Sequence, residues 1–290
     1  MISLVQLGTV DYATGLRLQQ QLVALRKEEK IGDVLLLLEH RPVITLGRNG
    51  KEANIIATPD VLAQRGVELF ECDRGGDVTF HGPGQIVGYP IFDLRGFAAS
   101  DGKRKTLGVI EFVRRLEDVL MRTCADFAIV TKRIPGLTGV WTAPEAMDDA
   151  HVATAAPRRR IEQSSAEELT LNTEAKLAAI GVHVSRSVTS HGFALNVNTD
   201  LSYFNLIVPC GITTKPVTSM KKELGTEFDL NTVAESISRN FGVVFQSQIL
   251  WVDTLDALLG RTVGVPTVGV PMKPPSELRK IHREDDTAWA

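Results

Sequence analysis

The chain has 290 residues, of which 43% are hydrophobic and 23% are charged, and its formal net charge at pH 7 is −3. These values are ordinary for a soluble globular protein of one large or two small domains, and the negative charge argues against a dedicated nucleic-acid-binding protein. No apolar run approaches the length that crosses a bilayer, no secretory signal opens the chain, and the three cysteines are widely spaced. We therefore expect a cytoplasmic protein in a reducing compartment, without membrane or nucleic-acid partners.

The first part of the chain combines one helical segment with short apolar runs of strand length. An amphipathic helix is predicted over residues 11–28, with Leu16, Val23 and Leu25 among its buried positions. Strands are predicted over residues 33–39, 43–46, 67–72 and 86–92.

The second part has the clearest helical period, over residues 107–124. Its predicted buried face comprises Val109, Phe112, Val113, Leu116, Val119 and Leu120, with Cys124 as a core thiol near its end. Two strands joined by a turn are predicted over residues 177–184 and 192–197. Thr232 and Glu235 have capping-box spacing and predict the start of a helix that ends near Gly242. This interleaving indicates an α/β (α+β) fold built around a sheet.

Two segments differ from the rest in composition. Residues 143–168, which include the arginine triplet 158–160, are polar and aperiodic and predict a flexible insertion in which that triplet is solvated. Residues 255–290 contain several prolines and a charged tail, and predict an extension that lies on the surface or is partly disordered. The folded unit is therefore expected over residues 1–254.

The most informative segment is Arg74-Gly-Gly-Asp-Val-Thr-Phe-His-Gly-Pro-Gly-Gln-Ile-Val-Gly-Tyr-Pro90. Glycine lets the backbone approach a ligand closely or adopt positive φ, whereas proline fixes the path of the chain. The polar side chains of the segment therefore sit on a backbone with little freedom. That combination favours a substrate pocket over a linker.

Cys210 is the candidate nucleophile, because Pro209 and Gly211 predict a sharp turn that presents its thiol. A nucleophilic cysteine must ionise, which requires a nearby cation or a helix N-terminus. Lys176, His81 and His191 are the candidate activators. The alternatives are a core cysteine, a solvated lysine at a strand end and histidines that are hydrogen-bonded for structural reasons.

Motifs for metals and nucleotides are absent from the sequence. There is no Cys-x-x-Cys or His-x-x-x-His pair, no phosphate-binding loop and no dinucleotide fingerprint. We therefore expect no metal, no cofactor and no use of ATP.

Four segments resemble the octanoyltransferases of lipoate biosynthesis, also called lipoyl(octanoyl) transferases. They are residues 38–48 (Leu-Glu-His-Arg-Pro-Val-Ile-Thr-Leu-Gly-Arg), 74–90, 176–197 and 209–211 (Pro-Cys-Gly). The resemblance implies a single catalytic domain of the biotin/lipoate protein ligase-like fold, with a mixed sheet flanked by helices. The 141–171 connection looks longer than is usual in that family, and the tail past about residue 255 has no counterpart that we can place.

The resemblance also implies the reaction. Octanoyl-acyl carrier protein would donate an octanoyl group to the ε-amine of a lysine on the lipoyl domains of 2-oxoacid dehydrogenase complexes and on the glycine-cleavage H protein. Cys210 would form an acyl-thioester intermediate, with Lys176 favouring its thiolate form. Thioester-to-amide transfer is downhill, which agrees with the missing nucleotide motifs.

The substrate-binding stretches implied by the resemblance are Arg74, Gly75, Gly76, Asp77, Val78, Thr79, Phe80, His81, Ala179, Ile180, Gly181, Gly192, Phe193 and Ala194. Among these, Val78, Phe80, Ile180 and Phe193 are expected to line an apolar slot for the acyl chain, with plain core packing as the alternative. A basic rim at Arg48, Lys215, Lys221 and Lys222 is predicted to assist docking of acidic partner domains.

Three rival functions remain open from the sequence. An ATP-dependent lipoate or biotin ligase would share the fold but need no cysteine nucleophile. A non-catalytic acyl-binding module would tolerate the loss of Cys210. An amidotransferase acting between two lipoyl-type domains would use similar cysteine chemistry.

Overall fold

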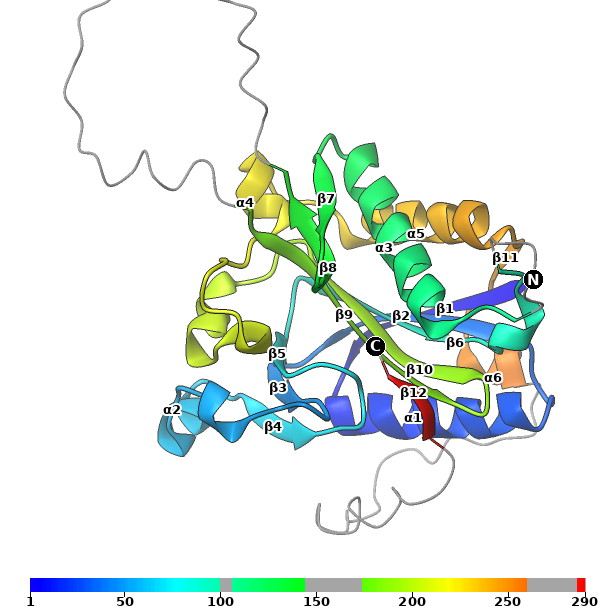
Figure 1. The fold of residues 1–290 in the computed structure, drawn as a ribbon, viewed down its shortest axis with the longest axis horizontal. Coiled ribbons are helices and arrows are strands. Elements are labelled where there is room, and N and C mark those ends of the chain that lie inside the picture. Colours follow the sequence, from blue (N-terminus) through cyan, green and yellow to red (C-terminus); the bar gives the residue numbers. More distant parts are fainter. Residues whose placement is uncertain (100–105, 144–173, 260–285, 290) are drawn as a thin grey trace, which may run out of the picture.

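The computed structural model describes residues 1–99, 106–143, 174–259 and, as backbone, 286–289 (Figure 1). The helices are α1 (Tyr12–Lys27), α2 (Pro59–Gln64), α3 (Val109–Asp126), α4 (Met220–Leu224), α5 (Leu230–Phe245) and α6 (Leu255–Leu259). The strands are β1 (Ile2–Val10), β2 (Asp33–His40), β3 (Val43–Leu46), β4 (Glu68–Glu71), β5 (Val78–His81), β6 (Gln85–Ile91), β7 (Thr131–Ile134), β8 (Leu137–Thr142), β9 (Lys176–Ser185), β10 (Val188–Asn196), β11 (Ile249–Trp251) and β12 (Asp286–Trp289). None of the helices within these ranges is long and apolar enough to span a membrane.

The strands form one large and one small sheet. The large sheet has the order β11-β1-β2-β6-β10-β9-β8-β7, and β12 pairs with β9. Strand β1 is parallel to β2 and β11, whereas the pairs from β2–β6 through β8–β7 are antiparallel. The small sheet has the order β4-β3-β5. The predicted mixed sheet flanked by helices is therefore confirmed.

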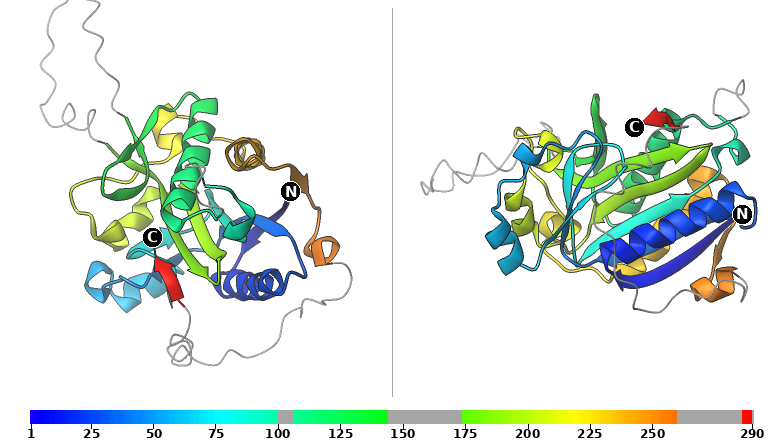
Figure 2. Two further views of the ribbon diagram at one scale, coloured as in Figure 1. Left: turned by 45° about the vertical axis from the view of Figure 1, so that its right-hand side comes forward. Right: turned by 90° about the horizontal axis from the view of Figure 1, so that it is seen from below.

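Helices cover both faces of the large sheet, with α3 and α5 on one face and α1 on the other (Figure 2). Strand β2 shows how the sequence produces this layering, because successive side chains on a strand point to opposite faces. Leu35 and Leu37 pack under α3 and α5, whereas Leu36 and Leu38 pack under α1. A strand buried on both faces must be apolar throughout, which is why the run 33–39 has no polar alternation.

The predicted first helix is present, but its buried face was predicted wrongly. Asp11 caps α1 by accepting a hydrogen bond from the backbone N–H of Thr14. The buried positions are Tyr12, Gly15, Leu18, Gln19 and Leu22, and the predicted Leu16, Val23 and Leu25 are half-buried. The face is rotated because Gly15 brings the helix against His40, where an added Cβ would lie 2.9 Å from the imidazole ring.

Helix α3 matches its predicted period. Phe112, Val113, Leu116, Val119, Leu120 and Cys124 are buried, and Val109 at the first turn is only partly covered. Burial raises the pKa of the Cys124 thiol to about 12, so this cysteine is the inert core residue that was expected.

Helix α5 begins earlier and ends later than predicted. Asp229 is its cap and accepts hydrogen bonds from the backbone N–H groups of Asn231 and Thr232. The Thr232 hydroxyl also donates to Asp229, so Thr232 lies inside the first turn and does not cap it. The predicted capping box with Glu235 is therefore wrong, since a better cap lies three residues upstream. The helix continues past Gly242 to Phe245.

Strands β9 and β10 form a hairpin in which β10 begins at Val188, four residues before its predicted start. Its two-residue turn has positive φ at both Arg186 and Ser187, as hairpins that match the strand twist require. Strands β1, β5, β7, β8 and β11 were not predicted. Of these, β5 lies inside the glycine-rich run.

Two predicted features lie largely outside the described residues. The predicted insertion 143–168, with its arginine triplet at 158–160, is described only at residue 143. Of the predicted extension 255–290, the structure describes helix α6 and the backbone of β12, which pairs antiparallel with β9. A folded domain over residues 1–254 stays a prediction.

Candidate active site

Cys210 and Lys176, which are 34 residues apart in the chain, meet beside the end of the large sheet. Lys176 is the first residue of β9, and Cys210 lies in the 3-10 turn Pro209–Gly211. The Lys176 Nζ donates to the Cys210 Sγ across 3.1 Å. The lysine side chain is thus directed at the thiol, and neither His81 nor His191 takes that place.

The backbone of Lys176 is held on both sides. Its N–H donates to the Pro216 carbonyl at 2.8 Å, and its own carbonyl accepts from the Thr218 N–H at 2.9 Å. The ammonium lies 5.1 Å from the centre of the Trp141 ring, and the residue is only 8% exposed. Among the described residues no carboxylate pairs with it. The neighbours of the Lys176 Nζ are therefore the thiol and the aromatic face.

The turn that carries Cys210 is sharp, as the sequence predicts, and its backbone is also strained. Cys210 has φ 55° and ψ 20°, a left-handed conformation that costs free energy for a residue with a Cβ. Pro209 precedes it, and Gly211 follows with φ 67°. A Cβ on Gly211 would lie 2.9 Å from the Asp77 carboxylate, and the positive φ of this residue also favours glycine. The surrounding structure thus fixes the direction of the thiol.

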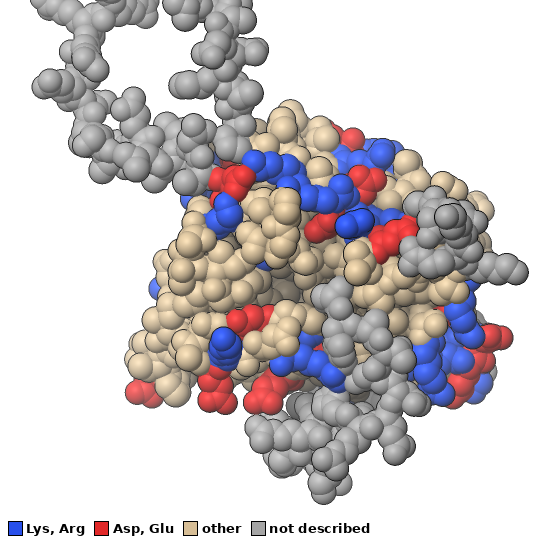
Figure 3. All heavy atoms as spheres, in the orientation of Figure 1, with Lys and Arg blue, Asp and Glu red and all other residues tan. Residues whose placement is uncertain are grey.

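A hollow of about 490 Å³, partly open to solvent, extends from Cys210 along β5, β9 and β10. In Figure 3 the face seen in Figure 1 is hollowed between β5 and β9, and its rim is mostly uncharged. Twelve of the fourteen predicted substrate-binding residues line this hollow: Arg74, Gly75, Gly76, Asp77, Thr79, His81, Ala179, Ile180, Gly181, Gly192, Phe193 and Ala194. We refer to it below as the acyl pocket.

Val78 and Phe80 do not line the acyl pocket, and the alternative of plain core packing describes them. Both lie in β5, where alternate residues face opposite ways. Thr79 and His81 face the pocket, whereas Val78 and Phe80 pack into the small core beside β3 with residues such as Ile44. The sequence did not show this because the run was not predicted to contain a strand.

Arg74 organises the loop before β5. Its guanidinium donates to the hydroxyl and carbonyl of Thr45 and to the Gly75 carbonyl, at distances between 2.7 and 3.2 Å. The side chain is 8% exposed. Since these donors are used within the protein, the structure places Arg74 as a positioning residue for the pocket wall.

Asp73 also holds this loop, and sequence reasoning missed it. Its two carboxylate oxygens accept from His183 Nδ1 at 2.5 Å and from His191 Nε2 at 2.6 Å. Burial alone would raise the pKa of Asp73, but the hydrogen bonds from both histidines hold it far below its usual value. The loop is thereby tied to β9 and β10. No local pattern could reveal this contact, since the partners lie 110 and 118 residues away.

His81 belongs to a buried chain of hydrogen bonds. Its Nδ1 lies 2.8 Å from Gln85 Oε1, Gln85 Nε2 donates to Asn196 Oδ1, and Asn196 Nδ2 donates to the Thr218 carbonyl. Thr218 in turn binds the backbone of Lys176. Burial, together with the neighbouring His40 and Arg74, lowers the pKa of His81 to about 3. His81 is therefore neutral, and this network connects the acyl pocket to the lysine.

His40 and Tyr89 form a second buried pair that was not among the predicted site residues. His40 Nδ1 donates to the Val10 carbonyl, and the Tyr89 hydroxyl donates to His40 Nε2 at 2.6 Å. Burial lowers the pKa of His40 to about 4 and raises that of Tyr89. Tyr89 lines the acyl pocket with Tyr12, whose ring stacks on His81. Both His40 and Tyr89 lie inside the segments that carry the family resemblance, which was the available signal.

The glycines of β9 and β10 allow these segments to pack closely. A Cβ on Gly192 would lie 2.1 Å from the Gly88 carbonyl oxygen, and one on Gly181 would lie 2.6 Å from the Gly75 carbonyl oxygen. Both glycines are therefore required by the backbone, in addition to lining the acyl pocket.

Two of the four residues of the predicted basic rim are in ion pairs. Lys215 pairs with Glu174, and Lys221 pairs with Glu227 at 2.6 Å. Lys222 has no acidic partner among the described residues. In the same part of the chain, no group of three or more His, Cys, Asp or Glu side chains is placed to hold a metal ion.

Comparison with known proteins gives a consistent family. Residues 11–242 match the lipoyl protein ligase A/B catalytic domain. The chain is 54% identical over 286 residues to an octanoyltransferase of Koribacter versatilis, with 98% of both chains covered. It is 51% identical over 261 residues to an octanoyltransferase of Acidobacterium capsulatum, covering 89% of this chain and 96% of that one. The first alignment extends into the C-terminal extension, so the expectation that this segment has no counterpart is wrong.

Solved structures share the fold at low sequence identity. A bi-partite lipoate protein ligase from Thermoplasma acidophilum matches with a TM-score of 0.60 and 13% identity, over 89% of this chain and 90% of that one. Lipoate-protein ligase A bound with ATP matches with a TM-score of 0.56 and 12% identity, over 90% and 94%. These likenesses concern the fold alone.

Proposed function

The chain belongs to the lipoyl protein ligase A/B catalytic-domain family, as an octanoyltransferase of protein lipoylation, and from that premise we propose that Cys210 and Lys176 are its catalytic dyad. The observation that carries the proposal is the 3.1 Å contact between the Lys176 Nζ and the Cys210 Sγ. We further propose octanoyl-acyl carrier protein as the donor. The acceptors would be lysines on lipoyl domains of 2-oxoacid dehydrogenase complexes and on the glycine-cleavage H protein.

In the first half-reaction the Cys210 sulfur, as a thiolate beside the Lys176 ammonium, attacks the carbonyl carbon of the donor thioester. The bond to the carrier sulfur breaks, and that sulfur leaves with a proton from Lys176. The products are an octanoyl thioester on Cys210, a free carrier thiol and a neutral Lys176 amine. One thioester replaces another, so the step is nearly balanced in free energy.

In the second half-reaction the neutral ε-amine of the acceptor lysine attacks the Cys210 thioester. Lys176 accepts the proton that this amine loses, and Cys210 leaves as a thiolate that the new ammonium stabilises. The products are an octanoyl amide and the starting ion pair. An amide is more stable than a thioester, so no ATP is needed to drive the transfer.

The acyl pocket suits the chain that is transferred. Burial of the seven carbons beyond the carbonyl favours binding by roughly 5 kcal/mol, at about 0.8 kcal/mol per methylene, before the cost of association. Ile180 and Phe193 provide apolar surface along the pocket. His81 lies there as a neutral ring with its pKa lowered to about 3, so the acyl chain meets no charge at that side chain.

The proposal is tested by intact mass spectrometry after incubation with octanoyl-acyl carrier protein. We expect one octanoyl adduct, mapped to Cys210 and discharged by an apo lipoyl domain. Cys210→Ala should give no adduct, whereas the matched control Cys72→Ser, at another partly buried cysteine, should be acylated normally. Octanoylation of the lipoyl domain by Cys210→Ala, or dependence on free octanoate and ATP, would refute the dyad.

A further inference from the structure

A second, wider groove opens on the far side of the dyad from the acyl pocket. The residues that border it include Phe204, Asn205, Ile212 and Lys222. Within the described part of the chain, no residue lines both this groove and the acyl pocket. A small hollow that contains both Cys210 and Lys176 lies between the two. That hollow shares Thr79, Ala179 and Ala194 with the acyl pocket, and Phe204, Pro209 and Val217 with the groove.

The sequence of acyl pocket, small hollow and groove has a consequence for a bound thioester. The carbonyl carbon of a thioester carries the acyl chain on one side and the sulfur of its carrier on the other. If the octanoyl chain fills the acyl pocket with its carbonyl at Cys210, the sulfur and the chain beyond it point into the groove. We propose that the groove binds the phosphopantetheine arm of the donor. The proposal rests on the proposed function and identifies where that donor is held.

The groove presents groups that match such an arm along its length. The arm contains two amides, a gem-dimethyl carbon and a phosphodiester. Phe204 and Ile212 offer apolar surface near Cys210. The side chain of Asn205 is exposed and makes no hydrogen bond within the described part of the chain, so it can pair with an amide.

The lysine charges at the groove favour a phosphorylated arm over a neutral one. Lys215 at the groove is paired with Glu174, and Lys221 outside it is paired with Glu227. Lys222 lines the groove, is exposed, and lacks an acidic partner among the described residues. A phosphodiester monoanion would supply the missing partner. The acceptor lysine must reach the same thioester carbon, so its domain is the competing occupant of the groove.

The experiment compares octanoyl thioesters of phosphopantetheine and of pantetheine, which differ only in the phosphate. The rate of Cys210 octanoylation is followed by mass spectrometry for the full chain and for Lys222→Glu. We expect Lys222→Glu to raise the concentration of phosphorylated thioester that gives the half-maximal rate by about fivefold to tenfold, as for loss of one charge-assisted contact. The corresponding concentration of the pantetheine thioester should not change. The matched control Lys221→Glu should change neither.

Three results would overturn the proposal. Lys222→Glu could slow octanoylation of Cys210 by both thioesters equally, or by neither. It could also change only the discharge of octanoyl-Cys210 by the lipoyl domain, which would assign the groove to the acceptor. Asn205→Leu provides a second test, because it should weaken both thioesters and leave the melting temperature unchanged. Failure of the proposed function is distinguishable, since the unmodified chain would then acquire no octanoyl group on Cys210 from any thioester.

Discussion

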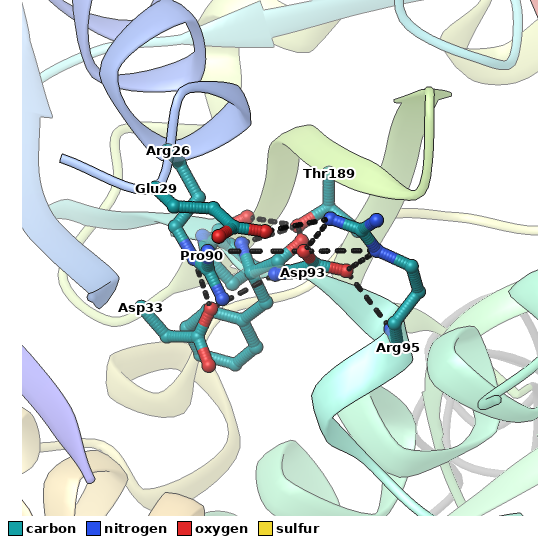
Figure 4. Close-up of polar contacts among 8 residues, drawn as sticks. Arg26, Glu29, Asp33, Pro90, Asp93, Arg95 and Thr189 are labelled. Carbon is teal, nitrogen blue, oxygen red and sulfur yellow. Dashed lines mark hydrogen bonds and ion pairs between the residues drawn. The ribbon is translucent and has the colours of Figure 1, made fainter. Parts of the chain in front are cut away.

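The two ends of the antiparallel strand pair β6 and β10 differ in how their charged side chains are partnered. At one end lies Asp93, which receives the Arg95 side chain at 2.6 Å and the Arg95 backbone N–H at 3.0 Å (Figure 4). Its own backbone N–H donates to Asp33, which in turn binds Arg26 at 2.8 Å. At the other end Lys176 faces a single thiol.

The difference agrees with the roles that we propose for the two regions. Burial would raise the pKa of Asp93, but hydrogen bonds from Arg95 outweigh it and leave the pKa lowered. Each charged side chain of this cluster lies beside one of opposite charge. Such a cluster holds the end of β6 against β2 and the end of α1. Lys176 has spare hydrogen-bonding capacity beside an apolar pocket. Loss of Lys176 should therefore affect chemistry, and loss of Asp93 should affect stability.

The largest expected effect tests the catalytic side of this comparison. Lys176→Met should lower the rate of octanoyl transfer by about 10³-fold, because the variant can neither stabilise the thiolate nor move the proton. Its melting temperature should stay close to that of the parent. The control is Lys132→Met, which removes a lysine of the edge strand β7 that pairs with Glu174, and it should retain full activity. A Lys176→Met enzyme within tenfold of the parent would break the comparison.

The next effect tests the structural side. Asp93→Asn should lower the free energy of unfolding by about 1–3 kcal/mol, because the buried Asp93 side chain loses the charge that pairs with Arg95 and Arg26. Octanoyl transfer per folded molecule should be unchanged. Thermal and urea denaturation provide the measurement. Glu29→Gln removes a solvent-exposed partner of Arg95 at 3.8 Å and should change the free energy by less than about 0.5 kcal/mol.

The smallest effect concerns pH and sharpens the comparison at the site. His81 is neutral in the folded state, where its pKa is about 3, whereas in the unfolded chain it titrates near 6.5. As the pH falls below 6.5 the unfolded state binds a proton that the folded state excludes, so stability is lost by up to roughly 1.4 kcal/mol per pH unit. His81→Gln should make urea denaturation less sensitive to pH between 6.5 and 5. An unaltered slope would show that His81 is protonated in the folded protein.

Much of the fold can be predicted from local sequence, and the predictions that were wrong or missing also have local causes. The apolar run of β2 and the period of α3 each reflect burial that can be predicted from the local order of apolar residues. The start of α5 was misplaced because two candidate caps, Asp229 and Thr232, lie within one turn. Strand β5 was missed because glycines surround it and obscure its alternation.

The site was predicted where a short motif carries it and was missed where it depends on distant contacts. The Pro–Cys–Gly turn indicates an exposed thiol, and the family resemblance assigns Lys176 to it. Asp73 has no motif of its own, since its role exists only when β9 and β10 are folded against the loop. The pairing of His40 with Tyr89 likewise depends on the alignment of β2 with β6.

The left-handed backbone at Cys210 has a consequence for protein engineering. A designer who wished to give a lipoate ligase scaffold this transferase chemistry would need to transplant the whole Pro209–Gly211 turn, and with it a small residue opposite Asp77. A cysteine introduced alone on an ordinary loop would aim its sulfur elsewhere. The proposed nucleophile thus depends on all three residues of the turn, of which only Cys210 carries the sulfur.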